Sequence, residues 1–170
     1  AHRPLEGEPL RHHVVLCGFG QVGSSLGKAL EIFNLPYMVI DRDPDIVRRL
    51  QSRGTACLYG DASHRELLVK AGAADASLII VALPEIEPAA LTVSRIRDLN
   101  QKVPILARAH GLAEAERLGA LGATEVIQPE VETSATLIRH ALTWFGVPRD
   151  RILDYVEQYR QSMETKRQTG

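Results

Sequence analysis

Short apolar runs alternate with segments of helical periodicity along most of this sequence, and this alternation constrains its fold more than any other feature. Strands are expected at 13–17, 37–40, 56–59, 78–82, 105–109 and 125–128, and helices at 21–33, 44–53, 63–71, 86–99 and 112–121. The run Leu78-Ile79-Ile80-Val81 is apolar throughout, which is typical of a strand buried on both faces of a parallel sheet. The pattern predicts an α/β fold: a Rossmann-like, doubly wound parallel sheet of about six strands with right-handed crossovers.

The two ends of the chain depart from this alternation. Residues 1–11 carry two prolines and no periodicity, which indicates a linker or tail. After Pro129 one helix is predicted over 131–145, where a Gly-Val-Pro segment ends it, and a second over about 149–164. The apolar positions of this last helix, from Ile152 to Met163, form one stripe. This stripe must pack either on its own domain or on a second subunit or a missing domain.

Composition and charge exclude several classes of protein. The 170 residues are 45% hydrophobic and 24% charged, the balance of one globular domain. The net charge of −1 provides no positive field for nucleic acid, and no apolar run approaches the roughly 20 residues of a membrane helix. Cys17 and Cys57 cannot build a disulfide framework, and no histidines or cysteines have zinc-ligand spacing, so no metal site is expected. The first residue is Ala1 rather than Met, which we interpret as the mark of a fragment.

The motif Gly18-Phe19-Gly20-Gln21-Val22-Gly23 follows the first predicted strand and opens the first predicted helix. In such a turn the first glycine allows the tight bend, the second lets a phosphate approach the backbone, and the third lets helix and strand pack closely. The helix N-terminus offers free N–H groups and a partial positive charge to an anion. The motif indicates a nucleotide phosphate site, and its alternative is a glycine-rich turn without a ligand.

Three further positions lie at the carboxyl ends of predicted strands, where open α/β sheets bind their ligands. Asp41 ends the second strand and can accept hydrogen bonds from ribose hydroxyls, whereas the adjacent Arg42 could accommodate a 2′-phosphate; Asp43 is expected to cap the following helix. Asp61 follows the third strand and either faces an adenine amino group or caps the next helix. Arg108 ends the fifth strand and either binds a phosphate or carboxylate or pairs with a nearby acid.

Several catalytic signatures are missing from the sequence. No Tyr-x-x-x-Lys pair occurs, the stretch 23–29 lacks the glycine spacing and the Ser or Thr of a P-loop, and no G-x-S-x-G motif is present. Residues 129–170 are too few for the substrate domain of a two-domain dehydrogenase. We therefore expect no enzyme activity. The alternative is a soluble NAD-dependent oxidoreductase fragment, and a weaker one is a dimerisation scaffold that has lost its ligand.

Five segments occur in the order of one known family, namely 13–23, 39–44, 59–63, 105–110 and 121–129. With them the sequence resembles, over about residues 11–148, an RCK N-lobe, also called a KTN or TrkA-N domain. The segments Val81-Ala82-Leu83-Pro84 and Ala107-Arg108-Ala109-His110 are most similar to the cytosolic C-terminal regulatory domains of bacterial Kef-type cation/proton antiporters.

The resemblance implies a division of the chain and a function. Residues 1–11 would end a linker from a preceding membrane domain that this sequence lacks, 12–148 would form the nucleotide-binding lobe, and 149–170 a C-terminal helix and tail. The domain would bind an adenine nucleotide, AMP foremost, or NAD, NADH, ADP or ATP. It would gate a potassium or other monovalent cation/proton antiporter of the same polypeptide at the cytoplasmic face of the inner membrane, and the fragment itself would be soluble. It would form a homodimer in which helix 131–145 crosses to the partner.

The resemblance also implies roles for individual residues. The phosphate would lie on the glycine turn, the ribose on Asp41 with Arg42 beside it, the adenine on Asp61 and Ala62, and the phosphate end near Arg108, so the implied contacts are Gly18, Phe19, Gly20, Gln21, Val22, Gly23, Asp41, Arg42, Asp61, Ala62 and Arg108. Glutathione-gated members of the family have arginines where this chain has Gln21 and His110, so gating by glutathione adducts is not expected.

Overall fold

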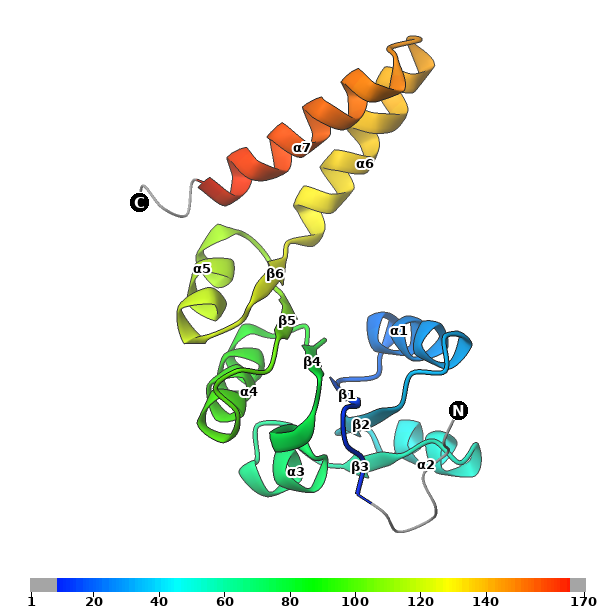
Figure 1. Ribbon diagram of the computed structural model, residues 1–170, viewed down its shortest axis with the longest axis vertical. Helices are drawn as coiled ribbons and strands as arrows, with labels where there is room; N and C mark the ends of the chain where they lie inside the picture. The colour runs from blue at the N-terminus through cyan, green and yellow to red at the C-terminus, as the bar shows by residue number, and fades with distance from the viewer. Residues whose placement is uncertain (1–8, 166–170) are drawn as a thin grey trace.

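A computed structural model describes residues 9–165 and confirms the predicted α/β fold (Figure 1). The sheet has six strands in the order β3-β2-β1-β4-β5-β6, and every neighbouring pair is parallel. The strands are β1 (Val14–Cys17), β2 (Tyr37–Asp41), β3 (Cys57–Tyr59), β4 (Leu78–Val81), β5 (Ile105–Arg108) and β6 (Glu125–Ile127). Because the chain steps outward from β1 in one direction and then from β4 in the other, the strand order reverses between these two central strands.

Helices cover both faces of this sheet. The helices of the described residues are α1 (Gln21–Ile32), α2 (Pro44–Ser52), α3 (Arg65–Lys70), α4 (Ile86–Leu99), α5 (Leu112–Leu121), α6 (Pro129–Trp144) and α7 (Arg149–Thr165), with a short 3₁₀ helix at Ala73–Asp75. Helices α1 and α2 lie on one face, and α3, α4 and α5 lie on the other (Figure 1). Helix α3 is shorter than the predicted 63–71, because Asp61 and Ser63 bond to each other in the turn before it.

The central strands are apolar at successive positions because each face of the sheet is buried. Val15 and Cys17 belong to the apolar cluster under α3, α4 and α5, whereas Leu16 belongs to the cluster under α1 and α2. All three side chains are 0% exposed. This explains why the strands lack the alternation of a half-exposed sheet.

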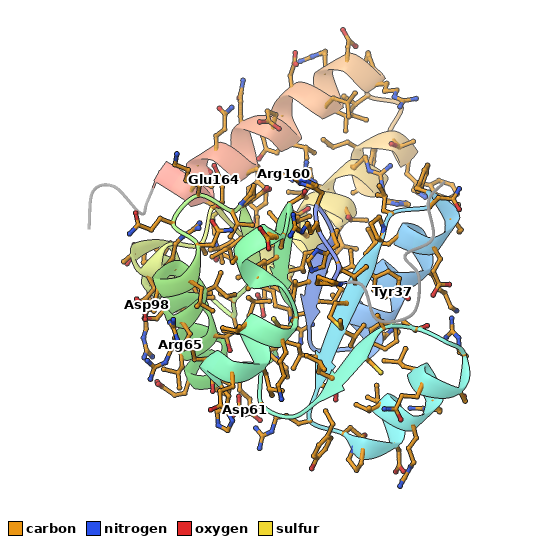
Figure 2. All side chains as sticks on the ribbon, turned by 60° about the horizontal axis from the view of Figure 1, so that its bottom comes forward. Tyr37, Asp61, Arg65, Asp98, Arg160 and Glu164 are labelled. Atoms are coloured by element: carbon orange, nitrogen blue, oxygen red, sulfur yellow. The ribbon has the colours of Figure 1, made fainter. Side chains whose placement is uncertain are left out.

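Tyr37 anchors the start of β2 beneath α1. Its hydroxyl donates a hydrogen bond to Glu31 Oε1 at 2.5 Å, and it lies close to Gly27, where a Cβ atom would come within 3.3 Å of the hydroxyl oxygen. Burial, together with the neighbouring Glu31 carboxylate, raises the pKa of Tyr37 to about 12. Figure 2 places Tyr37 at the α1 side of the sheet.

Helices α6 and α7 form an antiparallel hairpin that projects from the β6 end of the sheet (Figure 1). We call residues 129–165 the arm and residues 9–128 the body. The buried side chains of the arm are those of Val131, Ala135, Ile152 and Val156, and the last three pack together between the two helices. Ile152, Val156 and Tyr159 of the predicted stripe therefore pack on α6, whereas Tyr155 is 54% exposed. The predicted tail at 166–170 and most of the predicted linker, residues 1–8, lie outside the described residues.

Candidate functional site

A cavity of about 420 Å³ opens at the carboxyl ends of the first five strands, at the point where the strand order reverses. Its lining consists of Gly18, Phe19, Gly20, Gln21, Val22, Ile40, Asp41, Arg42, Gly60, Ala62, Ala82, Leu83, Pro84 and Arg108. The structure thus brings together most of the residues predicted from the sequence. Two of them, Gly23 and Asp61, are not part of this lining.

The glycine turn between β1 and α1 is held in shape by two of its glycines. Gly18 has a φ of +97°, a conformation that disfavours side chains. A Cβ atom at Gly23 would lie 2.1 Å from the Gly18 carbonyl oxygen, so only glycine allows α1 to approach the strand this closely. Gly23 therefore contributes to the site by helix packing rather than by facing the cavity, as the G-x-G-x-x-G motif predicts.

Gly20 differs from these two glycines because the space around it is open. A Cβ atom built on Gly20 would meet nothing within 4 Å. Gly20 is also the N-cap of α1, where no side chain caps the helix and no acidic residue occupies the first turn. Within α1 itself no acidic side chain competes for the backbone N–H groups at the helix N-terminus, and the helix dipole favours an anion there.

Asp41 lies at the end of β2 beside the glycine turn, and backbone N–H groups fix its carboxylate. Its Oδ2 accepts a hydrogen bond from the Phe19 N–H at 2.7 Å, and its Oδ1 accepts one from the Asp43 N–H at 2.8 Å. A carboxylate oxygen has two lone pairs, so each oxygen can accept a further hydrogen bond from a ligand. Asp43 itself accepts from the Asp45 N–H at 2.8 Å, which confirms that it caps α2.

Arg108, at the end of β5, is one of the two arginines that line the cavity. Its Nε atom is buried and has no hydrogen-bond partner among residues 9–165. No carboxylate in this part of the chain forms an ion pair with it, so the alternative of a structural ion pair is not realised. A buried N–H group without a hydrogen-bond partner destabilises the folded protein. An anion that accepts a hydrogen bond from Arg108 would remove this penalty.

Asp61 lies beside the cavity rather than in its lining. Its Oδ1 accepts hydrogen bonds from the Ser63 N–H at 2.9 Å and from the Ser63 hydroxyl at 2.7 Å. Partial burial acts to raise the pKa of Asp61, but the Ser63 hydrogen bonds outweigh it and the pKa is lowered. The N-cap position of α3 belongs to His64, so Asp61 stabilises the turn before that helix instead of capping it. Its contact with an adenine ring stays a prediction.

Five residues of the lining were not among the predicted site residues, namely Ile40, Gly60, Ala82, Leu83 and Pro84. Most of them share one signal, since Gly60, Ala82, Leu83 and Pro84 come directly after β3 or β4. Position after a strand could have identified them, because ligands of open α/β sheets bind outside the strand ends. Gly60 itself adopts a φ of +141° in the turn after β3, a conformation that favours glycine.

The lining of the cavity contains few ionisable side chains. Among its described lining residues, Asp41 is the only carboxylate, and the remaining ionisable groups are the guanidinium groups of Arg42 and Arg108. Burial raises the pKa of Cys17, behind the turn, to about 12, so this thiol stays protonated at neutral pH.

Within residues 9–165 no group of three or more His, Cys, Asp or Glu side chains could hold a metal ion. In the same part of the chain, no helix combines the length and the hydropathy needed to span a membrane.

Comparison with known proteins gives one family and several relatives. The family described as the TrkA-N domain matches residues 14–129. The chain is 28% identical over 156 residues to a putative K(+) efflux antiporter KefB of Alkalimonas amylolytica, covering 92% of this chain and 24% of that protein. It is 32% identical over 127 residues to a putative cation/proton antiporter YbaL of Escherichia coli, covering 75% of this chain and 23% of that protein. The chain therefore spans about a quarter of these relatives.

Solved structures show the same fold. The TrkA-N domain of the inner membrane protein YbaL from Escherichia coli superposes with a TM-score of 0.73 at 31% identity, covering 75% of this chain and 95% of that chain. The Kef C-terminal domain of Shewanella denitrificans in its AMP-bound form has a TM-score of 0.77 at 24% identity, covering 91% and 94%. The GsuK channel bound to NAD has a TM-score of 0.66 at 26% identity, covering 77% and 23%.

Proposed function

Because the chain belongs to the TrkA-N domain family, we propose that it is a regulatory domain that binds an adenine nucleotide and gates a cation/proton antiporter. Its relatives carry the names of K(+) efflux and cation/proton antiporters, and the chain corresponds to about a quarter of each. The antiporter would be part of the same polypeptide, with this domain at the cytoplasmic face of the membrane. Residues 1–11 would then come from the linker, 12–148 from the nucleotide-binding lobe, and 149–170 from a C-terminal helix and tail.

One observation carries the nucleotide proposal: Arg108, whose Nε is buried and unpartnered among the described residues, lines the same cavity as the open N-terminus of α1 and the fixed carboxylate of Asp41. A phosphate would accept hydrogen bonds from the backbone N–H groups of Gly20 and Gln21 and from the guanidinium group of Arg108. The ribose hydroxyls would donate to Asp41. The adenine would lie over Ala62 and beside Arg42.

The part of the ligand that this site recognises is the AMP unit. Adenosine with one 5′-phosphate is common to AMP, ADP, ATP and NAD, and the contacts assigned to Gly20, Asp41 and Arg108 use only that unit. The GsuK channel, related at 26% identity, has been solved with NAD, which contains it. The Kef C-terminal domain that resembles this fold was solved with AMP.

A regulatory role fits the lining better than catalysis does. Hydride transfer to a carbonyl substrate requires a positioned proton donor and a substrate site. Asp41, the only carboxylate among the described lining residues, already accepts two backbone hydrogen bonds and faces the proposed ribose. Oxidation of NADH with simple carbonyl substrates would instead favour the oxidoreductase alternative.

Gating requires a second conformation that binds the nucleotide with a different affinity. We assign that change to a homodimer in which the arm packs on a second copy of the chain. The support is the exposed apolar surface of the arm: Trp144 and Phe145 are both 88% exposed. Burial of such exposed aromatic side chains against a partner would stabilise the dimer, because it removes apolar surface from water.

Isothermal titration with adenosine, AMP, ADP, ATP, NAD and NADH tests the site. Gly20→Val should abolish AMP binding, because its side chain would occupy the space of the phosphate. The control is Gly119→Val in α5, where a Cβ atom also meets nothing within 4 Å, and it should bind AMP like the unchanged protein. Equal AMP affinity in both variants would place the ligand elsewhere, and no binding of any nucleotide would favour the scaffold alternative.

Arg108→Met separates recognition of the phosphate from recognition of the nucleoside. Hydrogen bonds to charged groups contribute about 1.5–3 kcal/mol, so AMP affinity should fall by roughly 10- to 150-fold. Adenosine, which has no phosphate, should bind this variant and the unchanged protein alike. An equal loss for both ligands would mean that Arg108 supports the fold of the site rather than the phosphate.

A further inference from the structure

The turn between β5 and α5 connects the cavity with the arm. Arg108 lines the cavity at the end of β5, and two residues later the imidazole of His110 reaches the first turn of α6. There its Nδ1 lies 3.0 Å from Glu130 Oε1. The backbone N–H of His110 donates to Glu114 Oε2 at 2.8 Å, which fixes the turn to the start of α5.

This contact occupies the place where the arm leaves the body. Figure 1 shows α6 departing from the body directly after β6, and α6 and α7 pack mainly on each other. Within residues 9–165, His110–Glu130 is the only ion pair that joins the body to the arm. The other charged pair at the base of the arm, Arg160–Glu132 at 2.9 Å, links α7 to α6. The His110 contact is therefore placed to influence the angle of the whole hairpin.

We propose that His110 and Glu130 form a pH-dependent latch that holds the arm against the body. Imidazole groups ordinarily change charge between pH 5 and 8, so the contact is an ion pair on the acidic side and at most a neutral hydrogen bond on the alkaline side. In agreement, the hydrogen bond with His110 lowers the pKa of Glu130. The latch would be open at alkaline pH and closed at mildly acidic pH. Only its link to the ligand, through Arg108, rests on the proposed nucleotide function.

The charged groups around His110 favour this direction of response. Glu130 on α6 and Glu114 on α5 both bond to this residue, and each attracts the charged imidazolium. Arg108 on β5 opposes it, and a bound phosphate would neutralise that opposition. The His110 and Glu130 side chains are 52% and 63% exposed, so the pair is partly screened by solvent, and we expect closure to change the arm equilibrium by about 2- to 5-fold.

Distance measurement between spin labels on the body and the arm tests the latch. Cysteines replace two exposed residues, Gln101 in the body and Thr136 on α6, with Cys57→Ser removing the half-buried native thiol and Cys17 left in place because it is buried. The labelled chain is mixed with excess unlabelled chain, so that only distances within one chain are measured. Between pH 5.5 and 8.5 the open population should rise by about 2- to 5-fold.

Three variants decide the outcome. His110→Gln and Glu130→Gln should remove the pH response, whereas His140→Gln, which removes an exposed histidine near the tip of the arm, should keep it. No pH response in the unchanged protein, or a response that survives in His110→Gln, would overturn the latch. The series is run first without nucleotide, so its result stands whether or not the cavity binds one. Added AMP should then increase the closed population, and failure of AMP binding in titration would be a separate failure of the proposed function.

Discussion

The body and the arm reach stability in different ways. In the body, two apolar clusters cover both faces of a sheet, and central strand residues such as Leu16 and Ile79 are 0% exposed. In the arm, the cluster between the helices holds only three buried residues, while Trp144 and Phe145 are 88% exposed. The body has the core of a self-sufficient domain. The arm is a two-helix hairpin that buries little apolar surface, and its stability depends more on what covers it.

The largest expected effect is a loss of stability of the body. Ile79→Ala removes a fully buried side chain from the centre of β4, and it should lower the free energy of unfolding by about 2–5 kcal/mol. Ile152→Ala, at a residue 3% exposed in the arm, removes the same atoms but should loosen only the hairpin. Urea unfolding measures both, with circular dichroism reporting on the whole fold and hydrogen exchange of the α7 backbone amides, followed at each urea concentration, reporting on the arm.

Two transitions are expected, with the arm losing structure at lower urea concentration than the body. Ile79→Ala should move the transition of the body, and Ile152→Ala only that of the arm. A single transition, shifted equally by both substitutions, would contradict the separate stabilisation of body and arm, because the two regions would then unfold as one cooperative unit.

The second effect concerns self-association through the arm. Replacing both Trp144 and Phe145 by serine should leave the unfolding of the body unchanged, because neither side chain is buried. It should weaken dimerisation by at least about 30-fold, since large aromatic side chains at the centre of an interface contribute about 2 kcal/mol or more. Sedimentation equilibrium over a range of protein concentrations measures the dissociation constant.

The body offers a matched control for this experiment. Ile32 and Phe33, at the end of α1, are 75% and 73% exposed and also adjacent in sequence. Their replacement by serine should leave the dissociation constant unchanged. Dissociation caused by this pair instead would move the interface from the arm to the body.

The body could be predicted closely from the sequence because its signals are local. Apolar runs and intervening helical patterns specified all six strands, and the glycine turn with Asp41 specified the place of the cavity. Element ends were less accurate. The strand expected at 13–17 begins at Val14, for example. His13, directly before it, is 0% exposed and bonds through Nε2 to the Ala71 carbonyl oxygen at 2.7 Å, a contact between residues 58 positions apart that the local pattern does not record.

The arm and parts of the site were less predictable because they depend on contacts that sequence patterns do not record. The apolar stripe of the last helix did not indicate which part of the molecule it contacts. In the structure, its buried residues pack on α6. The bonds from Ser63 to Asp61 Oδ1 hold the turn before α3, and the local sequence pattern alone did not distinguish this role from helix capping or a ligand contact. Arg108 could be assigned either a ligand or an acid from its position alone, and only the three-dimensional surroundings show that no described acid reaches it.

The smallest expected effect on stability comes from two surface ion pairs, one in the body and one in the arm. In the body, Arg117 on α5 donates to both carboxylate oxygens of Glu87 on α4, at 2.6 Å and 3.0 Å, and these bonds lower the pKa of Glu87 below 4.5. Because the folded-state pKa is the lower one, the pair stabilises the body above pH 4.5 and this contribution is lost as the pH falls. Glu87→Gln should therefore reduce the free energy of unfolding slightly at pH 7 and not at all well below pH 4.5. Glu132→Gln, which removes the partner of Arg160, should change only the transition of the arm, measured by hydrogen exchange of the α7 amides. A change in the body transition from Glu132→Gln would show that the arm is bound to the body more firmly than their separate cores indicate.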